Sequence, residues 1–147
     1  MTRLVAGTLA HAILTSASDA IVAADRDGII TYWNPGAERI FGHETDEAVG
    51  QSLDLIIPER LRAAHWQGFS SVIRTGVSRY GPGDVLSVPG VRRDGRRLSL
   101  EFTIVPLADD DGQLAGMAAV MRDVTERFDE IKTLRHRLAE LERAAPG

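Results

Sequence analysis

The sequence predicts an α+β fold in which an antiparallel sheet carries helices on one of its faces. Three observations indicate this class: a β-hairpin pattern near the N-terminus, three strand patterns in the second half, and helical patterns between them. The chain has 147 residues, the length of one domain with short extensions, and its 44% hydrophobic residues suffice for a real core.

The N-terminal segment is predicted to form an amphipathic helix followed by a hairpin. Leucine, valine and isoleucine recur at helical spacing between Leu4 and Thr15. A short apolar strand at 20–24, a turn that ends at Gly28, and a β-branched and aromatic strand at 29–33 follow. These two strands are expected to pair with each other.

The middle of the chain is predicted to be helical. The pair Asn34-Pro35 is typical of a helix N-terminus, where Asn caps free amide groups and Pro occupies the first turn. This short helix is expected to end at Gly42. Pro58 opens the longest interior helix, which is expected to reach about Arg74.

Three strands are predicted next, at 85–91, 98–105 and 117–121, separated by turns that end in Asp-Gly. Pro89 indicates that the first of them lies at an edge of the sheet, because proline cannot donate to a ladder of hydrogen bonds. The second strand alternates, and one of its faces carries Leu98, Leu100, Phe102 and Ile104.

The last predicted element is an exit helix with a coiled-coil seam. Apolar residues recur there with 3-4-3 spacing, and Val124 adds one heptad before Ile131, Leu134, Leu138 and Leu141. So short a seam is expected to extend a dimer that the domain already forms, not to hold one alone. Alternatively, these side chains pack back on the domain. The expected boundaries are 1–16 for the N-terminal helix, 17–123 for the domain, 124–143 for the exit helix and 144–147 for a disordered tail.

The composition excludes several classes of function. Without cysteine the chain has no disulfide, thiolate metal site or cysteine nucleophile. A net charge of -4 gives no general attraction to nucleic acid. No apolar stretch approaches the roughly 20 residues of a membrane span, and no signal-peptide pattern occurs, so a cytoplasmic protein is expected. Phosphate-binding loops, nucleophile elbows and zinc-type histidine pairs are also missing, so no enzyme activity is expected.

Several segments together resemble the PAS family of sensory domains. They are the run from Asp19 to Ile30, the motif from Trp33 to Gly42, the turn from Arg92 to Arg96, and the ending from Arg122 to Arg127. The resemblance implies a five-stranded antiparallel sheet whose helical side encloses a ligand pocket. It also implies a homodimer formed through the flanking helices and a role in signalling. PAS domains bind haem, flavins or small acids, or bind nothing, so the family alone does not name the ligand.

One histidine is the candidate metal ligand. The predicted long helix carries an inward stripe at four-residue steps, formed by Leu61, His65, Phe69 and Ile73. Neutral imidazole is the usual proximal ligand of haem iron. The segment from Ile57 to His65 is also similar to haem-binding PAS domains of the FixL type, whose proximal histidine lies on this helix. That resemblance implies haem b with iron held by His65.

The sequence departs from the FixL-type pattern on the other side of the pocket. Those oxygen sensors place an arginine on the following strand, whereas this chain has Leu86 there, after the loop Gly81-Pro82-Gly83. A pocket lined by Leu86, Phe102 and Ile104 would admit carbon monoxide or nitric oxide, but it offers bound oxygen no donor. The leading prediction is a haem sensor of a gas or of redox state.

Two other interpretations of the pocket remain open. The first is a cofactor-free PAS module for dimerisation and protein interaction, whose pocket is filled by side chains or a small ligand. The second is a non-covalent flavin stacked on Trp33 or Trp66, because light-sensing flavin domains need a cysteine that this chain lacks. No output module follows Arg127, so the chain is expected to act through a downstream partner, which the sequence does not identify, or to be part of a longer sensor.

Two further groups of basic residues are candidate sites. The remaining histidines, His11, His43 and His136, are expected at the surface. A group of arginines around the predicted Asp94-Gly95 turn suggests a contact for an acidic partner; it comprises Arg92, Arg93, Arg96 and Arg97.

Overall fold

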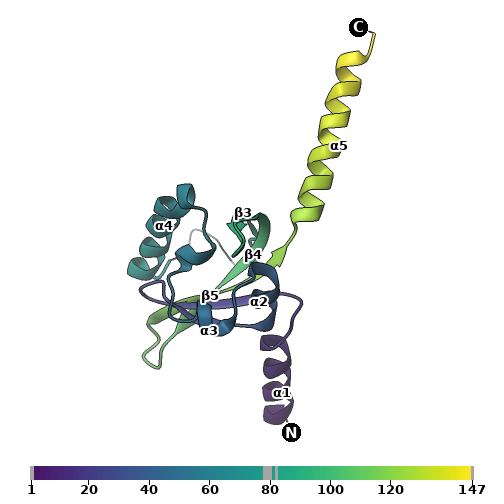
Figure 1. The fold of residues 1–147 in the computed structure, drawn as a ribbon. Helices are drawn as coiled ribbons and strands as arrows, with labels where there is room; N and C mark the ends of the chain where they lie inside the picture. The colour runs from purple at the N-terminus through teal and green to yellow at the C-terminus, as the bar shows by residue number, and fades with distance from the viewer. Residues whose placement is uncertain (1, 78–80, 82, 147) are drawn as a thin grey trace.

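The computed structural model describes residues 2–77, 81 and 83–146, and within this part of the chain a five-stranded antiparallel sheet organises the fold (Figure 1). The strand order is β2-β1-β5-β4-β3. The strands are β1 (Ala20–Asp25), β2 (Ile30–Trp33), β3 (Leu86–Val91), β4 (Arg97–Ala108) and β5 (Leu114–Asp123). The predicted α+β class with five antiparallel strands is confirmed.

Helices fill the chain before, between and after the strands. They are α1 (Thr2–Leu14), α2 (Pro35–Phe41), α3 (Thr45–Ala48), the 3-10 turns Leu53–Ile56 and Glu59–Leu61, α4 (Arg62–Thr75) and α5 (Thr125–Ala144). The helix expected from Pro58 therefore begins as a 3-10 turn, in which the amide of Leu61 donates to the carbonyl of Pro58 at 2.9 Å. The α-helical part starts only at Arg62.

Strands β4 and β5 are longer than the side-chain pattern predicts. They pair from Leu100↔Asp123 to Ala108↔Leu114, well past the alternating apolar segment. Backbone hydrogen bonds set the ends of a strand, and residues 105–108 of β4 are paired although they are exposed. Pro89 lies in β3 at the edge of the sheet, as predicted.

The densest part of the core lies between α2 and the sheet. Phe41 is fully buried, and its ring lies 5.4 Å from that of Trp33. The predicted cap of α2 is present: Asn34 Oδ1 accepts a hydrogen bond from the amide of Ala37 at 2.9 Å. At the other end of the helix, Gly42 has a φ of 81°, a left-handed conformation that favours glycine.

The two terminal helices leave the domain in opposite directions (Figure 1). Residues 6–14 of α1 are all exposed, and α5 contains no buried residue. The alternative in which the seam packs back on the domain is wrong, because its four residues have exposed fractions from 43% to 70%. Helix α5 includes Ala144, one residue into the predicted tail, and Gly147 of that tail lies outside the described residues. Over the described ranges, no helix is both long and apolar enough to cross a membrane.

Candidate functional site

His65 lies on the first half of α4 and is half-buried. The ring of Trp66 meets it edge-on at 4.8 Å, and that of Phe69 lies 5.9 Å away. Its Nδ1 atom is buried and has no hydrogen-bond partner among the described residues. Burial lowers the pKa of His65 below the ordinary 6.5, and the nearby carboxylate of Asp54 opposes this shift. The imidazole is therefore neutral at pH 7, the form that ligates a metal.

The neighbouring tryptophan anchors this part of α4. Trp66 Nε1 donates to Asp54 Oδ1 at 2.7 Å. The Trp66 ring also lies so close to Gly28 that a Cβ there would come within 2.2 Å of it. Arg62 Nε donates to the carbonyl of Ile57 at 3.1 Å. These contacts hold the N-terminal half of α4 against the preceding 3-10 segment and so orient His65.

The other predicted site residues fall into two groups. Phe69 lies beside His65 on α4 and is buried. Leu61 lies in the turn just before α4 and is half-buried. Leu86, Phe102 and Ile104 are half-buried on the sheet. Leu86 and Phe102 are direct partners across β3 and β4, which places both on one wall.

Burial changes along one face of β4. Leu98 and Leu100 are each 3% exposed, whereas Phe102 and Ile104, on the same face, are only half-buried. The helical layer therefore covers the first half of this face completely and the second half incompletely. An apolar ligand over the second half of this face would bury Phe102 and Ile104, which lie on the same face as the buried Leu98 and Leu100.

The protonation of His65 gives a testable pH dependence. Because its pKa lies below 6.5 in the folded protein, the unfolded chain takes up the proton first as the pH falls. We expect the free energy of unfolding to decrease between pH 7 and pH 5 more steeply in the wild type than in His65→Gln. Urea unfolding at both pH values measures this. Parallel pH profiles of the two proteins would contradict the lowered pKa.

Two aromatic residues differ from their predicted roles. Trp33 is 2% exposed, packs against Phe41, and donates from Nε1 to the carbonyl of His43 at 3.0 Å, so it is a core residue and not a surface on which flavin could stack. His43 is half-buried beside Trp33, not on the surface as expected, and burial lowers its pKa. Of the other histidines, His11 and His136 are exposed as predicted.

Two of the four arginines near the β3–β4 turn are engaged within the domain. Arg92 donates to the carbonyls of Arg39 and Ile40 and thereby caps the C-terminus of α2. Arg93 forms an ion pair with Glu47 at 2.7 Å. Arg96 and Arg97 are exposed, so the contact with an acidic partner stays a prediction for these two arginines.

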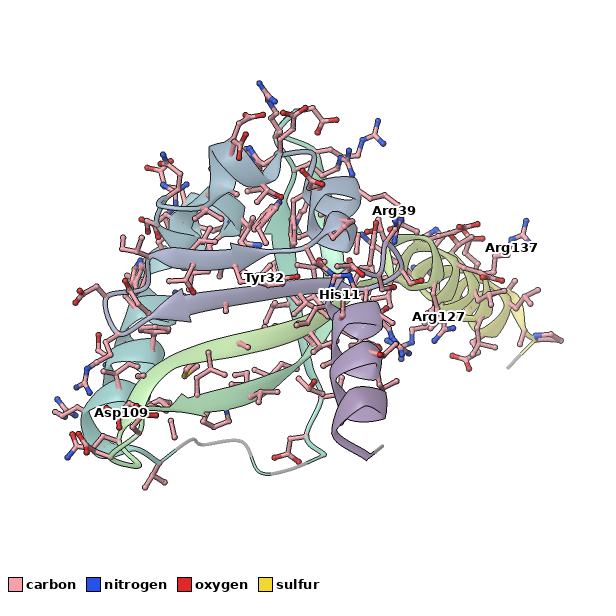
Figure 2. All side chains as sticks on the ribbon, turned by 90° about the horizontal axis from the view of Figure 1, so that it is seen from below. His11, Tyr32, Arg39, Asp109, Arg127 and Arg137 are labelled. Atoms are coloured by element: carbon pink, nitrogen blue, oxygen red, sulfur yellow. The ribbon has the colours of Figure 1, made fainter. Side chains whose placement is uncertain are left out.

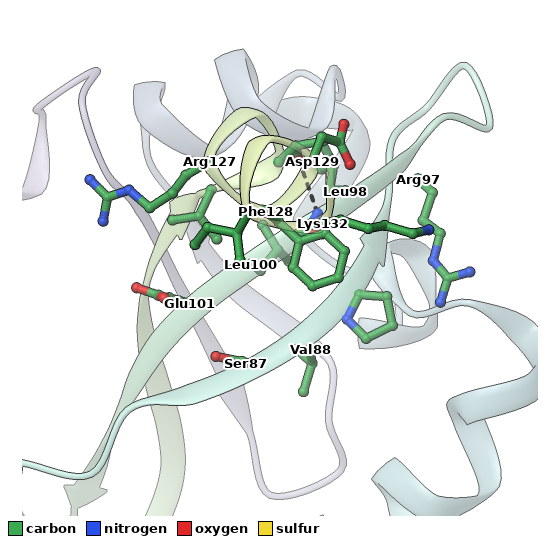
Figure 3. A pocket seen from close by; sticks show the side chains of 15 residues that line it. Ser87, Val88, Arg97, Leu98, Leu100, Glu101, Arg127, Phe128, Asp129 and Lys132 are labelled. Atoms are coloured by element: carbon green, nitrogen blue, oxygen red, sulfur yellow. Dashed lines mark hydrogen bonds between the residues drawn. The ribbon is translucent and has the colours of Figure 1, made fainter. Parts of the chain in front are cut away.

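A separate hollow of about 500 Å³ lies where α5 leaves the sheet (Figure 3). Its walls come from β3, β4 and the first two turns of α5, and Phe128 lies over β4 within it. Phe128 and Ile131 line it although both are largely exposed. None of the residues predicted to line the haem pocket lines this hollow, but Arg97 of the arginine group does. The seam pattern does not indicate this hollow, because Phe128 lies outside the 3-4-3 spacing.

Comparison with known proteins shows to which family of proteins the chain belongs. The family model described as the PAS fold matches residues 14–129. The chain belongs to the PAS family, a family of sensory modules, which confirms the predicted membership.

Relatives of known name place this domain among signalling proteins. The chain is 32% identical over 141 residues to the signal transduction histidine-protein kinase AtoS of Escherichia coli, covering 94% of this chain and 21% of that protein. It is 32% identical over 116 residues to the sensor protein FixL of Bradyrhizobium diazoefficiens, covering 79% of this chain and 22% of that protein. The chain thus spans about a fifth of the length of these relatives.

The fold also matches solved structures. An RNA-binding light-oxygen-voltage receptor is similar with a TM-score of 0.69 and 25% identity over 95% of this chain and 38% of that one. A PAS domain from Colwellia psychrerythraea gives a TM-score of 0.68 at 22% identity, over 83% of this chain and 98% of that one.

Proposed function

We propose that this domain senses a gas or redox state through haem b held by His65, and that it relays the signal through α1 and α5 of a homodimer. The observation that carries the proposal is the half-buried, neutral imidazole of His65, one of whose ring nitrogens has no partner in the described structure. The sheet adds an apolar wall that the helices cover incompletely. The relationship to the sensor protein FixL supports it. The cytoplasmic location expected from the sequence stays a prediction.

The residues present fit a haem. His65 offers one imidazole to an iron, and Leu86, Phe102 and Ile104 offer an apolar surface to a planar macrocycle. Bound haem would supply the binding of diatomic gases or one-electron chemistry. The chain's own residues would hold the group, exclude water from it and keep the imidazole neutral. Because Leu86 stands at the position of a possible donor, carbon monoxide or nitric oxide is favoured over oxygen as the ligand.

The alternative is a cofactor-free PAS module for dimerisation and protein interaction. The packed half of the core favours it, because Phe41, Leu98 and Leu100 need no ligand to be buried. In this case the apolar wall of Leu86, Phe102 and Ile104 binds a small apolar ligand or is covered by the protein's own side chains. His65 is then a neutral residue without a metal.

An absorption spectrum separates the two functions. Protein made with an adequate haem supply is expected to show an intense Soret band that shifts with carbon monoxide. The band is expected to be lost or altered in His65→Ala but kept in His43→Ala, the matched change at the other half-buried histidine. A colourless wild-type protein that also fails to take up added haem would exclude the haem proposal and leave the cofactor-free module.

The charge pattern of α5 supports the proposed dimer. With Ile131 and Leu138 at the first position of each heptad, Glu130 and Arg137 precede the seam while Arg135 and Glu142 follow it. In a parallel, in-register pair, a residue that precedes the seam on one helix faces a residue that follows the seam on the other helix, five positions further along. Glu130 would meet Arg135 of the partner subunit, and Arg137 would meet Glu142 of the partner subunit. Both contacts are attractive.

The hollow at the start of α5 continues this surface towards the domain. Ile131 belongs both to the seam and to the wall of the hollow, and Phe128 lies one turn before it. A second copy of the chain that paired along α5 would cover these exposed apolar side chains. The dimer would thus include the edge of the sheet as well as the helix.

A further inference from the structure

The segment that joins α1 to the sheet is held through its backbone carbonyl groups. The carbonyls of residues 16 to 19 all accept hydrogen bonds, and so does that of Leu14. All of these donors belong to one stretch of chain, from β2 to the last turn of α2. They are Tyr32 Oη to Leu14, Asn34 Nδ2 to Ser16 and Asp19, the Gly36 amide to Ser16, and Arg39 to Ala17 and Ser18.

Two of these donors are part of the core and cannot move independently of it. Asn34 and Gly36 are buried, and a Cβ at Gly36 would lie 1.9 Å from the carbonyl oxygen of Asp19. Arg39 differs because it is exposed and reaches the linker from outside the core. Its Nε donates to the carbonyl of Ala17 at 2.7 Å and its Nη2 to that of Ser18 at 2.6 Å. A guanidinium can donate to two acceptors at once from one rigid plane, which lysine cannot do.

Helix α1 has little else to fix its direction. Its described side chains are exposed, including Leu9 at 58% and Ile13 at 53%. Figure 2 shows Tyr32 and Arg39 near the end at which α1 meets the domain, while the rest of the helix extends freely. The orientation of α1 therefore depends on the linker, which Asn34 and Gly36 hold from the core. Tyr32 and Arg39 hold it from outside the core, at Leu14 and at Ala17 and Ser18.

We infer that Arg39 is a latch that sets the direction in which α1 leaves the domain. The latch sits in the last turn of α2, whose carbonyls at Arg39 and Ile40 accept hydrogen bonds from Arg92 of the β3–β4 turn. A shift of that turn against α2 would move the guanidinium of Arg39 and redirect α1. This inference goes beyond the proposed function and involves no cofactor, so it stands or fails separately from haem binding.

Distances between spin labels test the latch directly. The chain has no cysteine, so labels can be placed at Thr8→Cys on α1 and Asp110→Cys in the β4–β5 turn, both exposed positions. Labelled chains are diluted with unlabelled ones, so that only distances within one chain are measured by pulsed electron paramagnetic resonance. The parent pair is expected to give one narrow distance distribution, and Arg39→Ala is expected to broaden it at least about twofold.

A matched control is available at the other end of the sheet. Arg26 is also exposed and donates to a carbonyl, that of Leu114, at 2.8 Å, so Arg26→Ala removes a similar bond but is expected to leave the distribution narrow. Arg39→Lys keeps the charge but loses the planar pair of donors, and it is also expected to broaden the distance distribution. This second variant keeps the test possible if Arg39→Ala does not fold. Arg92→Ala is expected to broaden the distance distribution less than Arg39→Ala does. An unchanged distribution in Arg92→Ala would show that the β3–β4 turn does not influence the direction of α1.

Two outcomes would overturn the latch. The first is an unchanged distribution in both Arg39 variants that retain a cooperative thermal transition, since Tyr32 and Asn34 would then hold α1 unaided. The second is equal broadening in Arg26→Ala, which would indicate a general loosening of the domain.

Discussion

Replacement of Asn34 by alanine is expected to lower the free energy of unfolding by about 3–5 kcal/mol, since each buried group left unpaired costs about 1–3 kcal/mol. Asn34 is 1% exposed and makes four hydrogen bonds. Its Oδ1 accepts from the amides of Ile21 and Ala37 at 2.8 and 2.9 Å, and its Nδ2 donates to the carbonyls of Ser16 and Asp19, each at 3.0 Å. One side chain thus ties β1, α2 and the α1 linker together.

Urea unfolding measures this loss, and two further variants interpret it. Gln67→Ala removes an exposed amide from α4 and is expected to change stability by less than about 0.5 kcal/mol. Asn34→Asp keeps the acceptor oxygen and loses the donor, so its stability is expected to lie between those of the wild type and Asn34→Ala. A loss below about 1 kcal/mol in Asn34→Ala would show that water or backbone shifts replace these bonds.

Most strands and helices could be predicted, because the signals that define them lie within a few residues of one another in the chain. Alternation along β4, the edge position of Pro89, and the Asn34-Pro35 start of α2 each depend on residues close together in the chain. The sequence also indicated that Asn34 caps a helix. It could not indicate that the same side chain reaches Ser16 and Asp19, because no local pattern reports which distant carbonyls a buried amide will meet.

The candidate site was predictable in composition but not in arrangement. Helical spacing correctly placed His65 beside Phe69, and sheet pairing places Leu86 beside Phe102. The burial of Trp33 and the half-burial of His43 depend instead on how α2 and its following loop fold over β2, which single-residue tendencies do not specify. The role of Arg39 was likewise invisible, since an exposed arginine at a helix end carries no sequence signal of its partners.

The second large effect is expected at the seam of α5. Leu138→Asp would place a carboxylate against the same position of the partner helix and remove two leucines from the interface. We expect it to weaken dimerisation at least about 100-fold, equivalent to about 2.7 kcal/mol. Sedimentation equilibrium measures this change. Thr133→Asp adds the same charge on α5 outside the seam and is expected to leave the dimer intact.

A charge exchange then tests the orientation of the two helices. Glu130→Arg would face Arg135 of the partner subunit in a parallel pair and is expected to weaken the dimer. Adding Arg135→Glu restores an attractive contact only if the helices are parallel, because in an antiparallel pair position 130 faces a position of its own kind on the partner helix and not position 135. Rescue by the double variant would therefore establish a parallel α5 pair. A wild-type chain that stays monomeric at about 100 µM would contradict the proposed dimer. A dimer that Leu138→Asp does not weaken would show that the chains associate through another surface.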